Sequence, residues 1–245
     1  MQTVNTIAAL RQILKPWRIN GERIAFVPTM GNLHAGHMRL VEAARLQAER
    51  VVVSIFVNPT QFGAGEDFES YPRTEKEDAE KLQASGADLL FLPGVAEMYD
   101  PGARTVVSVS GLADKYCGAF RPGHFDGVAT VVSKLFNIVQ PDTAFFGLKD
   151  YQQFVIIQTM VRDLDIPVQV MPVETVREAS GLAMSSRNGY LSEQEKNNAV
   201  TLYQCLCTAR DSVLNGQASY VEIERQAQAV LAAANFLVDY FSICR

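Results

Sequence analysis

Residues 23–37 read RIAFVPTMGNLHAGH, and this stretch decides the fold of the first part of the chain. Residues 23–29 form a short apolar run, which predicts a buried strand. Gly31 and Gly36 then let the backbone turn sharply and pass close to a ligand. Apolar residues recur at helical spacing over residues 37–50, so the whole stretch predicts a strand, a glycine-rich turn and a helix.

The same alternation continues along most of the chain. Further strands are expected over residues 51–57, 88–92, 104–110, 143–146 and 168–173. Helices are expected over residues 74–85, 127–139 and 152–164. We expect Thr74 and Glu77 to form a capping box at the first of these helices. Strands separated by helices indicate an α/β fold with a Rossmann-like, doubly wound parallel sheet, whose ligands bind at the carboxyl ends of the strands.

The last part of the chain has a different pattern. Ser192 and Glu195 predict a capped helix that runs to about Leu214. A second helix is expected over residues 220–234, and a terminal strand over residues 236–243. We therefore expect two domains, a Rossmann-like catalytic domain over residues 1–175 and a smaller α+β domain over residues 176–245.

Composition restricts the class of protein. The chain has 245 residues, a net charge of −5 and an apolar share of 48%, which is typical of a globular protein. The acidic balance argues against a nucleic-acid partner, and the sequence shows neither a membrane span nor a signal peptide. The cysteines show no zinc-binding spacing, so we expect reduced thiols in a cytoplasmic protein.

His34 and His37 follow the first predicted strand and open a helix. Their spacing of three places both rings on one side of the first turn, where free N–H groups and the helix dipole favour phosphate. One alternative is a glycine-rich turn with two surface histidines. A metal pair is another, although it would need a further ligand that the neighbouring sequence does not offer.

Polar side chains follow other predicted strands in the same way. Lys149 can place a positive charge on a polyphosphate, and Asp150 can orient a ribose or the lysine, or cap the next helix. Gln153 can present both ends of its amide to a small polar substrate. Asn58 and Gln61 come just after residues 51–57. For all of these residues an ordinary turn or helix cap is the alternative.

Residues 184–188 read MSSRN, late in the chain. Hydroxyl groups beside an arginine fork suit phosphate recognition in a mobile loop. Taken alone, the segment could be a polar turn before Ser192. Beside the histidine motif, it is similar to the K-M-S-K-S loop of class I aminoacyl-tRNA synthetases.

Together these segments resemble the pantothenate synthetase (pantoate–β-alanine ligase) family of the HxGH nucleotidyltransferase superfamily. The resemblance covers roughly residues 20–195 and rests on FVPTMGNLHAGH, VNPTQFG, YPRT, RPGHFDGVATVV, KDYQQ and LAMSSRN. It implies ATP-dependent condensation of (R)-pantoate with β-alanine to pantothenate through a pantoyl-adenylate, with release of AMP and pyrophosphate. It further implies Mg²⁺ as a cofactor and a homodimer.

The resemblance also implies roles for individual residues. The catalytic groups would be His37, His34, Lys149 and Arg187. The ATP site would further include Met30, Gly31, Asn32, Leu33, Ala35, Gly36, Gly147, Leu148, Asp150, Val176, Met184, Ser185 and Ser186. Pantoate and β-alanine would contact Gln61, Gln153, Asn58, Tyr71 and Arg121. Asp78 matches an acidic position on the magnesium side.

Three features depart from the family pattern. Leu148 stands where an acidic residue is usual, and Ala35 replaces a glutamate. The family usually continues beyond the position of Arg245, so we expect a shortened C-terminal lid. Two rival hypotheses are an adenylyl- or cytidylyltransferase of the same superfamily and a nucleotide-binding regulatory domain. A dinucleotide oxidoreductase is disfavoured because no G-x-G-x-x-G follows the first strand.

Overall fold

The computed structural model describes residues 1–216 and 218–244, and its contacts divide the chain into two compact units, Met1–Thr175 and Val176–Arg245. In the described residues, six strands form one sheet with the order β1-β4-β3-β2-β5-β6, and every neighbouring pair is parallel. The strands are β1 Gln2–Val4, β2 Ile24–Thr29, β3 Arg50–Ile55, β4 Leu89–Phe91, β5 Thr143–Gly147 and β6 Gln169–Val173. The predicted α/β fold is therefore confirmed.

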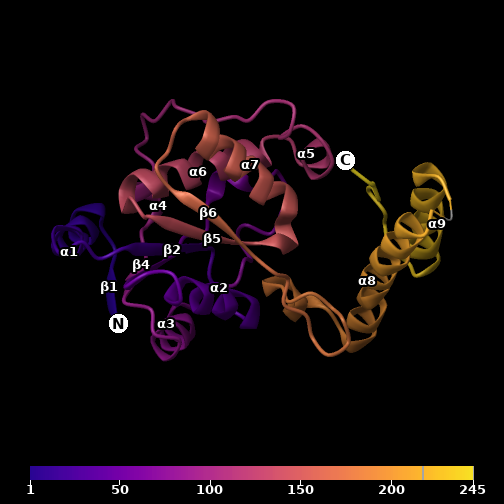
Figure 1. Ribbon diagram of the computed structural model, residues 1–245, viewed down its shortest axis with the longest axis horizontal. Helices are drawn as coiled ribbons and strands as arrows, with labels where there is room; N and C mark the ends of the chain where they lie inside the picture. Colours follow the sequence, from indigo (N-terminus) through magenta and orange to yellow (C-terminus); the bar gives the residue numbers. More distant parts are fainter. Residues whose placement is uncertain (217, 245) are drawn as a thin grey trace. The chain divides into compact units, whose positions relative to one another are not determined.

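Helices cover both faces of this sheet, with α2 and α3 on one face and α6 and α7 on the other (Figure 1). The helices of the first unit are α1 Ile7–Ile19, α2 Ala35–Arg45, α3 Glu75–Ala84, α4 Val95–Met98, α5 Cys117–Phe120, α6 His124–Val139 and α7 Tyr151–Asp163. Short 3₁₀ helices occur at η1 Pro59–Gln61 and η2 Leu148–Asp150. Successive side chains of a strand point to opposite faces, so Ala25 and Val27 join one core cluster while Phe26 joins the other.

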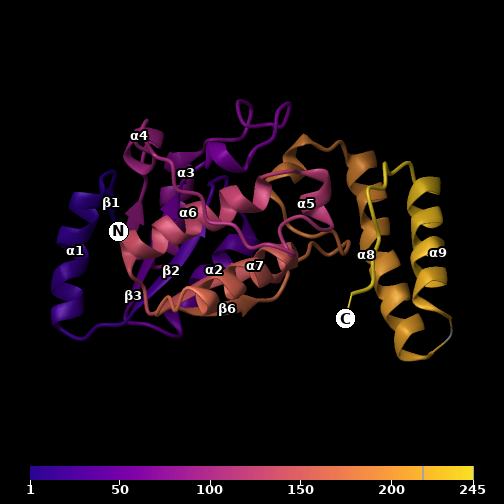
Figure 2. The ribbon, with the colours of Figure 1, turned by 90° about the horizontal axis from the view of Figure 1, so that it is seen from above.

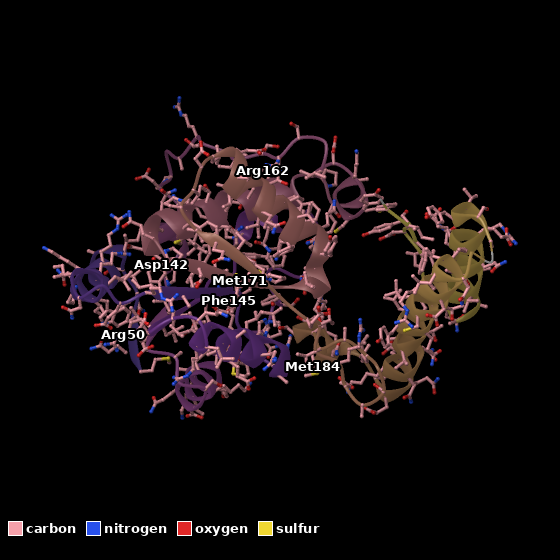
Figure 3. The ribbon with its side chains drawn as sticks, in the orientation of Figure 1. Arg50, Asp142, Phe145, Arg162, Met171 and Met184 are labelled. Carbon is pink, nitrogen blue, oxygen red and sulfur yellow. The ribbon has the colours of Figure 1, made fainter. Side chains whose placement is uncertain are left out.

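At the amino edge of the sheet, aspartate side chains accept hydrogen bonds from N–H groups at the start of strands β2 and β3. Asp142 Oδ2 accepts a hydrogen bond from the Ile24 N–H at 2.7 Å, and Asp88 Oδ2 accepts one from the Val51 N–H at 2.8 Å. Asp88 also pairs with Arg50 at 3.3 Å. Figure 3 labels Arg50 and Asp142, and also Phe145 and Met171, which lie in register on β5 and β6. The candidate motifs follow the opposite, carboxyl edge.

The strand order changes direction between β2 and β5. From β2 the chain adds β3 and then β4 on one side, and it later returns to place β5 on the other side of β2. In doubly wound sheets, ligands bind in the crevice at such a switch point, outside the carboxyl ends of the strands. The histidine motif follows β2 and residues 148–153 follow β5, so both lie at this point.

The second unit contains the 3₁₀ helix η3 Ser186–Tyr190 and two helices, α8 Glu193–Leu214 and α9 Tyr220–Ala233. The predicted capping box of Ser192 and Glu195 at the start of α8 is confirmed. Helices α8 and α9 lie side by side, and the segment 236–244 runs along them (Figure 2). Their shared core includes Cys205, Leu231 and Phe241.

Two predicted strands, over residues 104–110 and 236–243, are wrong. In the first segment the Val107 N–H donates to Thr130 Oγ1 of α6 at 2.9 Å, and Val107 packs on the main core. In the second, Phe241 is buried and the Ile243 N–H donates to Glu224 Oε1 at 2.6 Å. Both segments alternate because one side is buried, but among the described residues no strand lies alongside to complete a ladder.

Three further details differ from the prediction. Thr74 occupies the N-cap of α3 without a side-chain capping bond, so the predicted capping box is wrong, and its hydroxyl donates instead to Asp78 Oδ2 at 3.1 Å. Strand β1 and helix α1 were not expected, because β1 has only three residues and α1 contains Pro16.

No helix in the described part of the chain combines the length and apolar character that a membrane span requires.

Candidate active site

His34 and His37 cap the N-terminus of α2 with their own rings. His34 Nδ1 accepts a hydrogen bond from the Gly36 N–H at 3.1 Å, and His37 Nδ1 accepts one from the His34 N–H at 3.2 Å. The two ring centroids are 4.1 Å apart. Because each Nδ1 is an acceptor, the neutral ring carries its proton on Nε2. Each ring can therefore offer an Nε2–H donor to a ligand.

Both rings are held in the neutral form at pH 7. Burial, together with the neighbouring His34 and Lys149, lowers the pKa of His37 to about 3. Burial is also the main cause of the lowered pKa of His34, followed by the positive charges of Lys149 and Lys81. The rings thus suit hydrogen bonding to phosphate oxygens, while the charge at this edge comes from the lysines.

The turn between β2 and α2 needs its glycine. Gly31 has a φ of +86° and Asn32 a φ of +49°. A Cβ atom on Gly31 would lie 3.1 Å from Ile55 Cγ2 and 3.3 Å from Asp78 Oδ2. Both the backbone conformation and the available space therefore require glycine at this position.

Asp78 of α3 holds this turn from the protein interior. Its side chain is fully buried, and its two oxygens accept the N–H groups of Asn32 and Leu33, both at 2.8 Å. Thr74 Oγ1 donates to the same carboxylate at 3.1 Å, and Lys81 Nζ lies 3.9 Å from it. In the described ranges, no group of three or more His, Cys, Asp or Glu side chains could hold a metal ion. The contacts of Asp78 support a role in shaping the turn.

The lysine motif follows β5 in η2 and the first turn of α7. Lys149 Nζ lies 3.3 Å from Asp150 Oδ1, and both side chains reach solvent. Asp150 occupies the N-cap of α7 but makes no side-chain capping bond. Of the roles expected for Asp150, the structure therefore shows the pairing with Lys149 and not the helix cap. Leu148 packs against the main core, which gives this position an apolar function in place of a carboxylate. Gln153 is partly buried in the first turn of α7.

Asn58 and Gln61 follow β3 and contact each other. Asn58 is 1% exposed, and its Nδ2 donates to Gln61 Oε1 at 3.0 Å and to the Gly127 carbonyl at 3.1 Å. The Gln61 amide is thereby oriented, with its Nε2 at 3.3 Å from Met30 Sδ. We predicted both residues as substrate ligands. The burial of Asn58 supports a role in holding Gln61, which is itself only partly buried.

Arg121, directly after α5, and His124, the first residue of α6, hold the same segment. Arg121 makes two bonds to Glu66, at 2.7 and 2.5 Å, and its Nη1 lies 3.1 Å from His124 Nε2. His124 Nδ1 lies 2.8 Å from the Gln61 carbonyl, so Nδ1 carries the proton and donates it there. Arg121 and Gln61, both predicted to bind pantoate or β-alanine, therefore lie next to each other.

Tyr71 and two missed residues complete this region. Tyr71 is 5% exposed, and its ring lies 5.9 Å from that of Phe62, centroid to centroid. His124 was missed as a site residue, although its loop, RPGHFDG, carried a recognisable signal. Tyr99, which donates to Asn58 Oδ1 at 2.8 Å, carried no signal in the sequence because the contact is made only by the fold.

The arginine loop belongs to the second unit. The Met184 N–H donates to the Val176 carbonyl at 2.9 Å, so two of the predicted nucleotide contacts pair within one hairpin (Met184 is labelled in Figure 3). Ser185 Oγ caps η3 by accepting the Arg187 N–H at 3.2 Å, and Arg187 extends from an exposed position. The participation of Ser185, Ser186 and Arg187 in a nucleotide site stays a prediction.

Comparison with known proteins agrees with this geometry. Residues 2–245 match the family model described as Pantoate-beta-alanine ligase. Pantothenate synthetase of Methylococcus capsulatus is 56% identical over 247 residues, which cover 100% of this chain and 86% of that protein. The enzyme of Alteromonas mediterranea is 53% identical over 245 residues, which cover 99% and 87%.

Solved structures give the same result. Pantothenate synthetase from Thermus thermophilus matches with a TM-score of 0.89 and 51% identity, covering 95% of this chain and 83% of that one. Pantoate-β-alanine ligase from Francisella tularensis, solved with β-γ ATP and β-alanine, matches with a TM-score of 0.81 and 33% identity, covering 94% and 86%. The chain therefore belongs to the pantoate–β-alanine ligase family.

Proposed function

We propose that this protein condenses (R)-pantoate with β-alanine to form pantothenate, with cleavage of ATP to AMP and pyrophosphate. Family membership over residues 2–245 supports the overall reaction. The observation that carries the site is the pair of neutral, backbone-locked histidines beside the charge of Lys149, at the switch point of the sheet. Such a site offers fixed donors and a positive charge to a polyphosphate.

The first step forms an acyl-adenylate. A carboxylate oxygen of pantoate attacks the α-phosphorus of ATP, and the bond from that phosphorus to the bridging oxygen of pyrophosphate breaks. Negative charge grows on the leaving pyrophosphate. The Nε2–H groups of His34 and His37 and the ammonium of Lys149 oppose this charge, which is usually the largest catalytic contribution in such sites. Arg187 would add a second cation from the loop 184–188.

The second step forms the amide. The free amine of β-alanine attacks the carbonyl carbon of pantoyl-adenylate, and AMP leaves. Gln61 and Gln153 would hold pantoate, and Arg121, which pairs with Glu66 and lies beside Gln61, would contribute to the pantoate and β-alanine site. The backbone of Val176 would meet the adenine. Holding the two reactants together replaces an encounter in solution by a reaction within one complex, which lowers the barrier substantially.

Magnesium would enter with the nucleotide. Asp78, the acidic residue that matches the family's magnesium side, already accepts N–H and hydroxyl donors and is fully buried. The protein groups therefore do not fit a site made by side chains alone. Mg²⁺ commonly binds through substrate phosphates and water, and this mode suits the site. A cytoplasmic homodimer, which the resemblance implied, also belongs to this proposal.

Product analysis tests the proposed function. The protein is incubated with ATP, pantoate, β-alanine and Mg²⁺, and each component is omitted in turn. We expect AMP and pantothenate only in the complete mixture, and exchange of pyrophosphate into ATP with pantoate alone. Transfer of an intact nucleotide to an acceptor without release of AMP would instead identify a nucleotidyltransferase.

A further inference from the structure

Tyr99 lies immediately after α4 and reaches the polar residues that follow β3. Its ring is 6.1 Å from that of Phe56, centroid to centroid, and Lys134 Nζ lies 5.6 Å from its centroid. Its hydroxyl donates to Asn58 Oδ1 at 2.8 Å. Burial raises the pKa of Tyr99, so the hydroxyl keeps its proton at pH 7 and remains a donor.

Asn58 can take only one orientation in these surroundings. Its Oδ1 accepts from Tyr99, from Thr60 Oγ1 at 3.0 Å and from the Thr60 N–H at 3.4 Å. Its Nδ2 donates to two acceptors, Gln61 Oε1 and the Gly127 carbonyl. A flipped amide would place Oδ1 against both of these acceptors and Nδ2 against the Thr60 N–H, and it would break the bonds that both hydroxyls donate to Oδ1. The hydroxyl of Tyr99 therefore contributes to fixing the Asn58 amide.

The orientation of Asn58 determines that of Gln61. Gln61 Oε1 accepts a hydrogen bond from Asn58 Nδ2. The backbone carbonyl of Gln61 accepts one from His124 Nδ1 at 2.8 Å. Within the described residues, the one hydrogen bond of the Gln61 NH₂ group goes to a weak acceptor, Met30 Sδ, at 3.3 Å. The end of Gln61 that can meet a ligand is thus the donor end, which suits a carboxylate or hydroxyl oxygen.

We propose that Tyr99 is a positioning residue whose hydroxyl, acting through Asn58, holds the Gln61 amide with its NH₂ group toward pantoate. This inference rests on the proposed role of Gln61 as a pantoate ligand. Tyr99 itself touches neither the substrate nor the reacting atoms. Thr60 shares the task, since its hydroxyl donates to the same oxygen of Asn58.

The test measures pantoate affinity directly. Calorimetry with α,β-methylene-ATP bound, which prevents the first step, gives a Kd for pantoate in each variant. Tyr99→Phe removes one of two hydroxyl donors, so we expect that Kd to rise by about 2–10-fold, the usual effect of one lost hydrogen bond. Tyr99→Phe with Thr60→Val removes both hydroxyl donors and leaves the Thr60 N–H, which lies 3.4 Å from Asn58 Oδ1, and we expect a larger rise, on the order of 10–100-fold. The affinity for the nucleotide analogue should stay the same.

Two controls separate positioning from general stability. Lys134→Met removes the cation over the Tyr99 ring but keeps the hydroxyl, and it should leave the pantoate Kd unchanged. Gln61→Ala is then combined with Tyr99→Phe in a double-mutant cycle. If Tyr99 acts through Gln61, Tyr99→Phe should have no further effect on pantoate binding in the Gln61→Ala protein.

The outcomes are distinguishable. Equal weakening of pantoate and nucleotide binding by Tyr99→Phe, or an undiminished effect in the Gln61→Ala background, would show that Tyr99 is only structural and overturn the inference. A Gln61→Ala protein that binds pantoate as well as the unmodified chain would instead overturn the proposed role of Gln61. A selective effect of Tyr99→Phe that disappears without Gln61 supports both.

Discussion

His37 shows how a single side chain combines a structural and a chemical task. Its Nδ1 caps α2 by accepting the His34 N–H at 3.2 Å, and burial lowers its pKa to about 3. Both tasks need the neutral ring. The protonation state of His37 therefore links the stability of the fold to the state of the site.

This link predicts how stability depends on pH. The ordinary pKa of 6.5 applies to unfolded His37, and the folded value is about 3, so the unfolded state binds more protons between these values. The contribution of His37 is fully present above pH 6.5 and is lost as pH falls below it, by about 2 kcal/mol at pH 5. Urea unfolding at pH 7.5 and 5 should show a smaller pH dependence in His37→Asn, which keeps an acceptor for the cap. Equal dependence in both proteins would contradict the assignment.

Lys149 supplies the positive charge of the site, and its removal should affect chemistry alone. We expect Lys149→Ala to reduce pantoate-dependent exchange of pyrophosphate into ATP by about 10²–10³-fold, because it opposes charge that grows on the leaving group. Its side chain is 38% exposed, so the unfolding midpoint should hardly change. Lys15→Ala, the same change of charge on exposed α1, is the matched control and should retain full exchange. Normal exchange in Lys149→Ala would refute its role.

At the scale of elements, Asp78 ties the turn after β2 to helix α3. Asp78→Asn replaces one acceptor oxygen by an amide that faces the N–H groups of Asn32 and Leu33. We expect the free energy of unfolding to fall by about 1.5–3 kcal/mol and ATP to bind more weakly. A metal-binding Asp78 predicts a different result, namely normal stability with a raised Mg²⁺ requirement. Urea unfolding and a magnesium titration of activity distinguish the two.

Gly127 allows helix α6 to contact η1 directly. A Cβ atom there would lie 2.5 Å from the Thr60 carbonyl. Gly127→Ala should therefore displace η1, destabilise the protein by about 2–4 kcal/mol and weaken pantoate binding through Gln61. Gly94→Ala is the control, because a Cβ at that position meets nothing within 4 Å. Thermal unfolding and pantoate calorimetry would measure both effects, and tolerance of Gly127→Ala would show that η1 does not depend on this close approach.

At the scale of the whole molecule, the sequence predicted what depends on strong local patterns. Runs such as VVVSIF are apolar apart from Ser54 because β3 is buried on both faces, so the parallel sheet could be anticipated. The wrongly predicted strands, over residues 104–110 and 236–243, have an alternating pattern, but no strand in the described part of the chain lies beside them. Pairing is a property of the assembled fold, and the segments themselves do not reveal it.

In the candidate site, too, some residues could be predicted from local patterns and others depend on the assembled fold. His34, His37 and Lys149 could be predicted because each follows a strand and carries a group suited to phosphate. The roles of Asn58, His124 and Tyr99 depend on contacts between residues as many as 69 positions apart, such as that of Asn58 with Gly127. Tertiary contacts of this kind leave no periodic signal in a single sequence. They decide which amide end of Gln61 meets the substrate.

The backbone lock on His34 and His37 also has a consequence for the protons of the reaction. A ring whose Nδ1 is occupied by a backbone N–H, and whose Nε2 already carries hydrogen, has no lone pair with which to act as a base. Neither histidine can therefore deprotonate the ammonium group of β-alanine. That substrate must reach the adenylate as the free amine or release its proton to an acceptor other than these two rings. The rate of the amide-forming step should accordingly follow the availability of free amine.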